Sequence, residues 1–225
     1  MKKTFSAIGL LCCIMAMLLG VSGCMGESKA ERIADEMLDY MSAKYGEDFV
    51  AISLHTKGVE MGYDELVCYE ANSSPLTDKV YVRRYATDDG IEFHDSYWGI
   101  LIRSQLEKEI NDVCLSYFTT SVTYASMSVH TFNDELKEDS SLEDGLAMGE
   151  SIHATVFIYV ESKENNNVDE YARAVLEIIK RKFPHNVIRL FYVTDGTCEK
   201  INRNNYNSFL NDYYNPDGKT CLAIY

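Results

Sequence analysis

Residues 154–160 read ATVFIYV and residues 187–193 read VIRLFYV, and these two runs decide the fold class of the second half of the chain. Apolar runs that are almost uninterrupted are typical of strands whose two sheet faces are both covered. Between them, Asn167 and Glu170 predict the start of a helix with apolar residues at helical spacing, and Pro184 follows its expected end. Strand, helix and strand at this length predict a parallel, right-handed βαβ unit.

Shorter elements are expected on both sides of this unit. Alternation over residues 122–130 predicts a strand, and an acidic stretch at 134–150 has room for one short helix. The acidic stretch lacks the spacing of an EF-hand, so we interpret it as a solvated surface rather than a calcium site. A last helix is expected near residues 204–213, followed by a turn at 215–218 and a strand at 221–225.

Two capping boxes predict two helices in the first half of the chain. Ser28 and Glu31 stand three residues apart before apolar residues at helical spacing, and Gly46 suits the end of that helix. Ser104 and Glu107 have the same spacing before a second helical pattern. We therefore expect one helix that ends near Gly46 and another that begins near Ser104.

Four short β-like runs lie between the two expected helices. They are separated by turn residues at 72–75 and 88–90, which favour hairpins, so we expect an antiparallel meander. The order of helix, meander and helix resembles small cystatin-like and PepSY-like α+β modules, a likeness of fold alone. The predicted class is α+β, with one half over residues 28–119 and an α/β-like half with the βαβ unit over residues 120–225. The four runs are residues 49–54, 65–71, 79–86 and 91–94.

The N-terminus has the layout of an export signal. Lys2 and Lys3 precede an apolar run at residues 7–19, which is shorter than the roughly 20 residues that a membrane-spanning helix needs. Residues 21–24 read VSGC, an aliphatic residue and two small residues before Cys24. This motif resembles the lipobox of bacterial lipoproteins, so the chain is expected to be a lipoprotein precursor.

The resemblance implies a defined processing and location. A diacylglyceryl group, with fatty acyl chains such as palmitate, would be joined to Cys24 by a thioether, and residues 1–23 would be removed as the signal peptide. Residues 24–27 would then form a short tether that holds the folded part at the extracytoplasmic face of the cell membrane. The alternative is an ordinary signal peptide or an uncleaved anchor in which Cys24 is incidental.

The charge of the chain restricts its partners. Removal of Lys2 and Lys3 with the signal peptide changes the formal net charge from −14 to −16. Such an excess of acidic residues opposes binding to nucleic acid and to anionic headgroups, so we expect the lipid on Cys24, rather than electrostatic attraction, to hold the protein at the membrane. The expected ligand is an unidentified protein, peptide or glycan, and no cofactor is predicted.

Four cysteines remain in the mature part besides Cys24. They allow three pairings, and the division near residue 120 favours two disulfides, Cys68 with Cys114 and Cys198 with Cys221. The alternative is four buried free thiols, because free cysteine packs as a small hydrophobic residue. No C-x-x-C pair is present, which argues against a zinc knuckle or a redox motif.

The residues that could carry catalysis form no recognisable motif. His94 and Asp95 are adjacent, so on an extended segment their side chains point to opposite faces. Ser126, Ser128 and His130 would share one strand face, but no nucleophile elbow accompanies them. Neither a metal site nor a nucleotide cofactor is predicted, because histidines and glycines lack the required spacing. The histidines are His55, His94, His130, His153 and His185.

Tyrosine is unusually frequent, with 16 residues against nine phenylalanines and one tryptophan. Its ring and hydroxyl suit contacts with sugars, peptides or proteins, although most tyrosines are expected on half-buried strands. Tyr97 and Trp98, between the meander and the second helix, are the candidate ligand contacts. We therefore expect a non-catalytic binding or interaction module. The alternative is an anchored cell-envelope hydrolase with a site assembled from residues distant in sequence.

Overall fold

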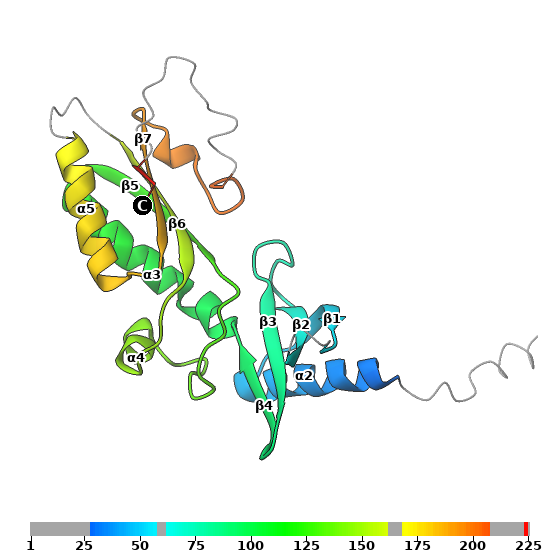
Figure 1. Ribbon diagram of the computed structural model, residues 1–225. Coiled ribbons are helices and arrows are strands. Elements are labelled where there is room, and N and C mark those ends of the chain that lie inside the picture. The colour runs from blue at the N-terminus through cyan, green and yellow to red at the C-terminus, as the bar shows by residue number, and fades with distance from the viewer. Residues whose placement is uncertain (1–27, 58–61, 162–167, 208–222, 225) are drawn as a thin grey trace, which may run out of the picture.

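The structure is a computed structural model that describes residues 28–57, 62–161, 168–207 and 223–224. The chain folds as an α+β protein with two four-stranded sheets, which confirms the predicted class (Figure 1). Outside the described residues lie the predicted signal peptide, Cys24 and the tether, Cys221, the turn at 215–218 and most of the last expected helix.

The first sheet, sheet A, is the predicted antiparallel meander, with strand order β1-β2-β3-β4. Helix α2 precedes it in the chain and packs against one face. At the tip of the β3–β4 hairpin, Gly90 has a φ of 139°, a conformation that favours glycine. The elements are α2 (Lys29–Tyr45), β1 (Phe49–His55), β2 (Tyr63–Glu70), β3 (Val80–Thr87) and β4 (Gly90–Asp95).

Helix α2 begins at the predicted capping box. The backbone N–H of Glu31 donates to Ser28 Oγ, and the backbone N–H of Ser28 donates to the Glu31 carboxylate. The helix ends at Gly46, whose φ of 73° is left-handed. Residues spaced by four place one apolar stripe against sheet A. The buried stripe consists of Ile33, Met37, Met41 and Tyr45.

The second sheet, sheet B, contains the predicted βαβ unit. Strands β6 and β7 are parallel, helix α5 connects them, and β5 and β8 are antiparallel to their neighbours. Within the described part of the chain, no helix is both long and apolar enough to cross a membrane. The elements are α3 (Tyr97–Leu115), β5 (Thr120–Met127), α4 (Leu142–Ala147), β6 (Ala154–Glu161), α5 (Val168–Lys182), β7 (Val187–Val193), the 3-10 helix η1 (Cys198–Lys200) and β8 (Ala223–Ile224).

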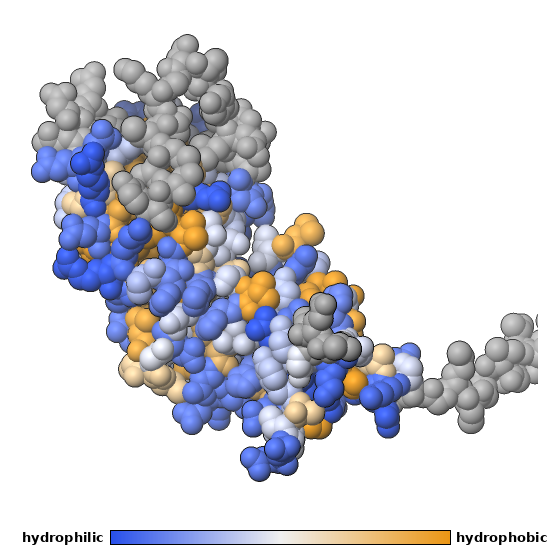
Figure 2. All heavy atoms as spheres, viewed as in Figure 1, coloured by the Kyte–Doolittle hydropathy of each residue, from blue (hydrophilic) through white to orange (hydrophobic). Residues whose placement is uncertain are grey.

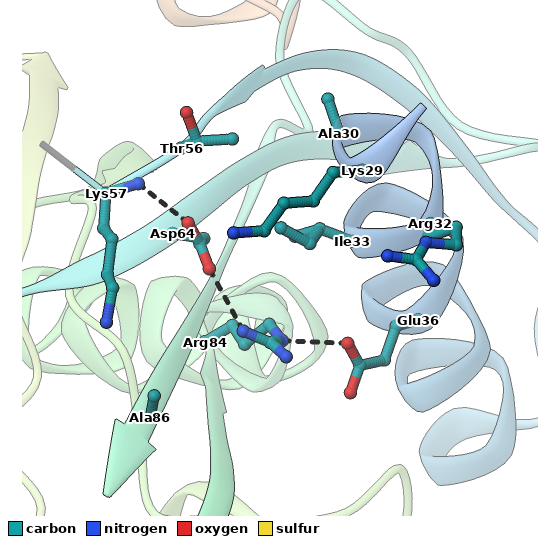
Figure 3. Close-up of a pocket in the computed structure, with 10 residues that line it drawn as sticks. All are labelled: Lys29, Ala30, Arg32, Ile33, Glu36, Thr56, Lys57, Asp64, Arg84 and Ala86. Carbon is teal, nitrogen blue, oxygen red and sulfur yellow. Dashed lines mark hydrogen bonds and ion pairs between the residues drawn. The ribbon is translucent and has the colours of Figure 1, made fainter. Parts of the chain in front are cut away.

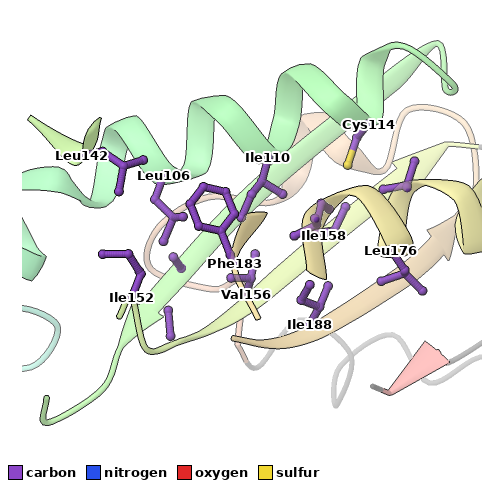
Figure 4. Packing of buried hydrophobic residues seen from close by; sticks show 14 of the residues in the cluster. Leu106, Ile110, Cys114, Leu142, Ile152, Val156, Ile158, Leu176, Phe183 and Ile188 are labelled. Carbon is purple, nitrogen blue, oxygen red and sulfur yellow. The ribbon is translucent and has the colours of Figure 1, made fainter. Parts of the chain in front are cut away.

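Sheet B has apolar cover on both faces, which explains the uninterrupted run at residues 154–160. On one face, Leu106 and Ile110 of α3 meet Phe183, next to α5, above Val156 of β6 (Figure 4). On the other face, a second cluster joins residues of β6 and β7 to the segment around η1. That cluster contains Phe157, Tyr159, Phe191, Cys198, Ile201 and Tyr206.

The second helix of the first half does not begin at Ser104, so that prediction is wrong. Helix α3 begins seven residues earlier, at Tyr97. Its first turns are buried, because Trp98 and Ile102 are both fully inaccessible to solvent. The Glu107 side chain makes no cap and instead accepts a hydrogen bond from the backbone N–H of Ala125, on β5.

Helix α3 belongs to both hydrophobic cores. Tyr97, Ile100 and Leu101 pack in the core between α2 and sheet A, whereas Leu106 and Cys114 pack in the core of sheet B. Figure 1 shows α3 running from the body that contains sheet A into the body that contains sheet B. The two cores therefore meet along the first turns of α3, where Trp98 and Ile102 already belong to the core of sheet B.

The contact between α4 and Trp98 gives a stability prediction. A Cβ atom on Gly145 would lie 2.1 Å from Cη2 of Trp98, so Gly145→Ala is expected to destabilise the fold by about 1–3 kcal/mol through overpacking. Urea unfolding would measure the effect. The matched variant Gly62→Ala, where nothing lies within 4 Å, should stay within about 0.5 kcal/mol of the parent. A Gly145→Ala protein as stable as Gly62→Ala would contradict the packing.

Candidate functional site

The two predicted ligand contacts are core residues, which corrects that prediction. Trp98 is fully buried, its Nε1–H donates to the carbonyl of Ser140 at 3.0 Å, and its ring packs edge to face against Phe132. Tyr97 is 6% exposed and packs edge to face against Tyr45. Both rings are buried because α3 begins at Tyr97, so neither can serve as a platform for a ligand.

The described cysteines are buried free thiols. Cys68, Cys114 and Cys198 lie in three different apolar clusters, so the predicted disulfide between Cys68 and Cys114 is wrong. The other predicted pair depends on Cys221, which lies outside the described residues. Burial raises the pKa of each of the three thiols to about 12, so none is a ready nucleophile.

A buried ionic cluster joins α2 to the start of α3. The side chain of Asp95 is 1% exposed, and its Oδ2 lies 2.9 Å from Lys44 Nζ. The Tyr40 hydroxyl donates to Oδ2 at 2.9 Å, and the Tyr45 hydroxyl donates to Oδ1 at 2.8 Å. The backbone N–H of Tyr97 also donates to Oδ1, at 2.9 Å. Both oxygens of this carboxylate are therefore fully engaged inside the protein.

The cluster extends to the loop after β5. The one proton of the Tyr40 hydroxyl is shared between Asp95 Oδ2 and Asp134 Oδ1, which both lie within hydrogen-bonding distance, and Asp134 Oδ1 also lies 3.0 Å from Lys44 Nζ. Burial opposes ionisation of Asp134, but hydrogen bonds from Tyr40 and Lys44 outweigh it and lower its pKa. Beside it, the backbone N–H of Phe132 donates to the Asp95 carbonyl at 2.8 Å. The cluster thus holds together α2, the start of α3 and a loop of the second body.

The face of sheet A that points away from α2 carries tyrosines. Because side chains alternate along β2 and β3, Leu66 and Val82 face α2 and the residues between them face the opposite side. Near the middle of that side, Arg83 Nε lies 3.0 Å from Glu65 Oε2, and the guanidinium lies 4.9 Å from the ring centroid of Tyr63. We call this surface the aromatic face. It comprises Tyr63, Tyr69, Tyr81, Arg83 and Tyr85.

The aromatic face is accessible and amphipathic. Its four tyrosines are only partly buried, and within the described part of the chain no hydrogen bond occupies their hydroxyl groups. Val50, 41% exposed, extends the face to the edge strand β1, where it is opposite Tyr69. Figure 2 shows hydrophobic residues reaching the viewed surface in separate patches rather than one continuous area. A partner would therefore meet rings, hydroxyls and the ion pair of Arg83 and Glu65 together.

The α2 side of sheet A contains a groove of about 790 Å³ between the first turns of α2 and the ends of β1, β2 and β3 (Figure 3). Arg84 lies between two carboxylates, with Nε 2.9 Å from Glu36 and Nη1 3.2 Å from Asp64. We call it the basic groove. Its other charged residues are Lys29, Arg32 and Lys57, all exposed.

Three histidines that are distant in the sequence stack at one edge of sheet B. His130 follows β5, His153 precedes β6 and His185 precedes β7, and successive ring centroids are 4.6 and 5.0 Å apart. Burial and the two neighbouring rings lower the pKa of His153. The stack could not be predicted from the sequence, because only strand pairing brings these segments together. Among the residues that the structure describes, no group of His, Cys, Asp or Glu is arranged to hold a metal ion.

The aromatic face was not predicted either, although part of its signal is present in the sequence. Tyr81, Arg83 and Tyr85 alternate, which places them on one side of a strand. What the sequence does not show is the register, which sets Tyr63 opposite Tyr85 with ring centroids 5.2 Å apart.

Comparison with known proteins places the chain in no recognised family. No family model matches it, and no curated protein matches it. Among solved structures, it is similar to a DUF5037 family protein from Ruminococcus gnavus ATCC 29149. The two are 14% identical, with a TM-score of 0.42, over 85% of this chain and 90% of that chain. The proposals below therefore depend on the residues of this chain.

The ionic cluster gives a second stability prediction. Asp95→Asn removes the charge that faces the largely buried Lys44 and leaves a side chain of the same shape. We expect a loss of about 3 kcal/mol in the free energy of unfolding, because the largely buried Lys44 would keep only the exposed carboxylate of Asp134 as its counter-charge. Denaturant unfolding would measure this loss.

An exposed ion pair provides the control. Asp112→Asn breaks the pair between Asp112 and Lys108, whose side chains are 57% and 76% exposed, and should cost less than about 1 kcal/mol. Equal losses for Asp95→Asn and Asp112→Asn would show that the buried cluster does not stabilise the junction.

Proposed function

We propose that the chain is a lipid-anchored lipoprotein of the extracytoplasmic membrane face, and that it binds a protein partner on the aromatic face without catalysis. The accessible set of tyrosines around Arg83 is the observation that carries the binding proposal. The VSGC motif that ends at Cys24 supports the anchoring proposal, and it lies outside the described residues.

The composition of the aromatic face favours a protein over a glycan. Tyrosine and arginine are enriched among the residues that contribute most to protein interfaces, where rings bury large areas at low entropic cost. The rings of Tyr63 and Tyr85 are inclined by 49°, so the two rings do not form one flat platform on which a sugar could stack. Arg83 lies over Tyr63 and is paired with Glu65, so a polar anchor is already oriented at the centre.

The alternative of an anchored hydrolase has less support. Residues distant in sequence do converge, as such a site requires, at Asp95, Lys44, Tyr40 and Asp134. The Asp95 and Lys44 side chains are only 1% and 7% exposed, however, and their polar atoms bind one another. This arrangement favours a structural role for the cluster.

The anchor has a direct chemical test. In cells given labelled palmitate, the unaltered protein is expected to incorporate the label and fractionate with membranes. Cys24→Ala removes the only thiol at the expected cleavage site and should abolish labelling. The control variant is Ser22→Ala. It keeps small residues before Cys24, so it should retain the label. Equal labelling of the Cys24→Ala and unaltered proteins would contradict the anchor.

The binding surface can be tested in intact cells by site-specific photo-crosslinking. A photoreactive residue at Tyr85, on the aromatic face, is expected to give a discrete protein adduct. The same residue at Ile178, 39% exposed on α5, should give none. Adding Arg83→Ala should reduce the Tyr85 adduct at least about tenfold, because hot-spot side chains contribute 2 kcal/mol or more.

The outcomes of this experiment separate the alternatives. A discrete adduct that Arg83→Ala abolishes supports the proposal. Adducts of equal yield from Tyr85 and Ile178 would contradict it, and so would an adduct formed with glycan rather than protein. Circular dichroism of each variant would confirm that loss of the adduct reflects binding and not unfolding.

A further inference from the structure

The charges in the basic groove are not balanced. Its two carboxylates, Glu36 and Asp64, both pair with Arg84, and the backbone N–H of Lys57 also donates to Asp64 at 2.7 Å. Within the described part of the chain, no ion pair engages the side chains of Lys29, Arg32 and Lys57. The described lining therefore carries four cations, Lys29, Arg32, Lys57 and Arg84, against two carboxylates, in a protein whose formal net charge is −14.

The surplus is a property of the groove lining alone. Glu31 belongs to the same helical turn and keeps its negative charge, because hydrogen bonds from Ser28 lower its pKa, but neither Glu31 nor Asp35 lines the groove. Arg84 is held rigidly by two carboxylates, so it shapes the floor of the groove, while the flexible lysines on either side remain available to a ligand (Figure 3). Such a hollow suits an anion with several acceptor oxygens, such as a phosphate group.

The position of the groove in the chain identifies the source of the phosphate. Lys29 follows Cys24 by five residues, and Arg32 follows it by eight. At roughly 3.5 Å per residue, the Cα atoms of Cys24 and Lys29 can lie no farther apart than about 18 Å. The groove would thus be held next to the layer of lipid headgroups, where basic side chains bind anionic lipids.

We propose that the basic groove binds the phosphate of an anionic phospholipid headgroup in the leaflet that holds the lipid anchor. This inference rests on the proposed anchoring. It also refines the expectation, drawn from the net charge, that electrostatic attraction plays no part at the membrane. Because the groove is on the α2 side of sheet A and the aromatic face is on the other, headgroup binding would turn the aromatic face away from the bilayer.

The test uses the full-length protein in nonionic detergent micelles that contain either phosphatidylglycerol or phosphatidylcholine, with binding measured by calorimetric titration. The unaltered protein is expected to bind phosphatidylglycerol saturably and phosphatidylcholine at least tenfold more weakly. The triple variant Lys29→Gln, Arg32→Gln and Lys57→Gln should lose about 100-fold in affinity for phosphatidylglycerol.

A matched triple variant controls for net charge. Lys137→Gln, Arg173→Gln and Lys200→Gln removes the same charge from exposed positions elsewhere, and should change the affinity by less than about threefold. Equal losses in the two triple variants would overturn the proposal, because binding would then follow net charge alone. Inorganic phosphate is titrated in the same way. If it binds as tightly as phosphatidylglycerol, the proposal is overturned, because the groove would then be a site for a soluble phosphate.

Failure of this proposal and failure of the anchor are distinguishable. Micelle binding does not require acylation, so the Cys24→Ala protein should bind phosphatidylglycerol as well as the unaltered protein does. If the unaltered protein incorporates no palmitate but still prefers phosphatidylglycerol, the anchoring proposal is wrong and the groove proposal stands. If the unaltered protein incorporates palmitate but does not prefer phosphatidylglycerol, only the groove proposal is wrong.

Discussion

The buried carboxylate of Asp95 is the constraint on which the arrangement of the two bodies depends. It is the last residue of β4, and only Ser96 separates it from α3, so it lies where sheet A passes into the second body. A carboxylate taken out of water must be matched by donors and a counter-charge, and Lys44, Tyr40 and Tyr45 of α2 supply them. The orientation of α2 relative to α3 follows from this requirement.

The fixed position of α2 gives sheet A two different faces. On one side, the helix buries its apolar stripe and leaves the basic groove beside its first turns. On the other side, the tyrosines remain accessible around Arg83. The proposed functions follow this division, with lipid headgroups on the helix side and a protein partner on the aromatic side. Neither surface requires a reactive group or a cofactor.

Local patterns predicted the elements, but not the contacts between them. The capping box at Ser28 and the βαβ unit needed only spacing and periodicity, and both are present. The start of α3 was misplaced because burial of Trp98, and not a polar cap, decides where that helix begins. The predicted pair of Cys68 and Cys114 failed for a related reason, since α3 carries Cys114 into the other core.

Hydrogen exchange at the junction tests the central claim most directly. The backbone N–H groups of Tyr97 and Phe132 both donate to Asp95, one to its carboxylate and one to its carbonyl. If Asp95 holds the two bodies together, both amides should exchange as slowly as those in the centres of β2 and β6, and only through global unfolding. Exchange of both amides at the rate of exposed loop amides, with the sheets still protected, would contradict the account.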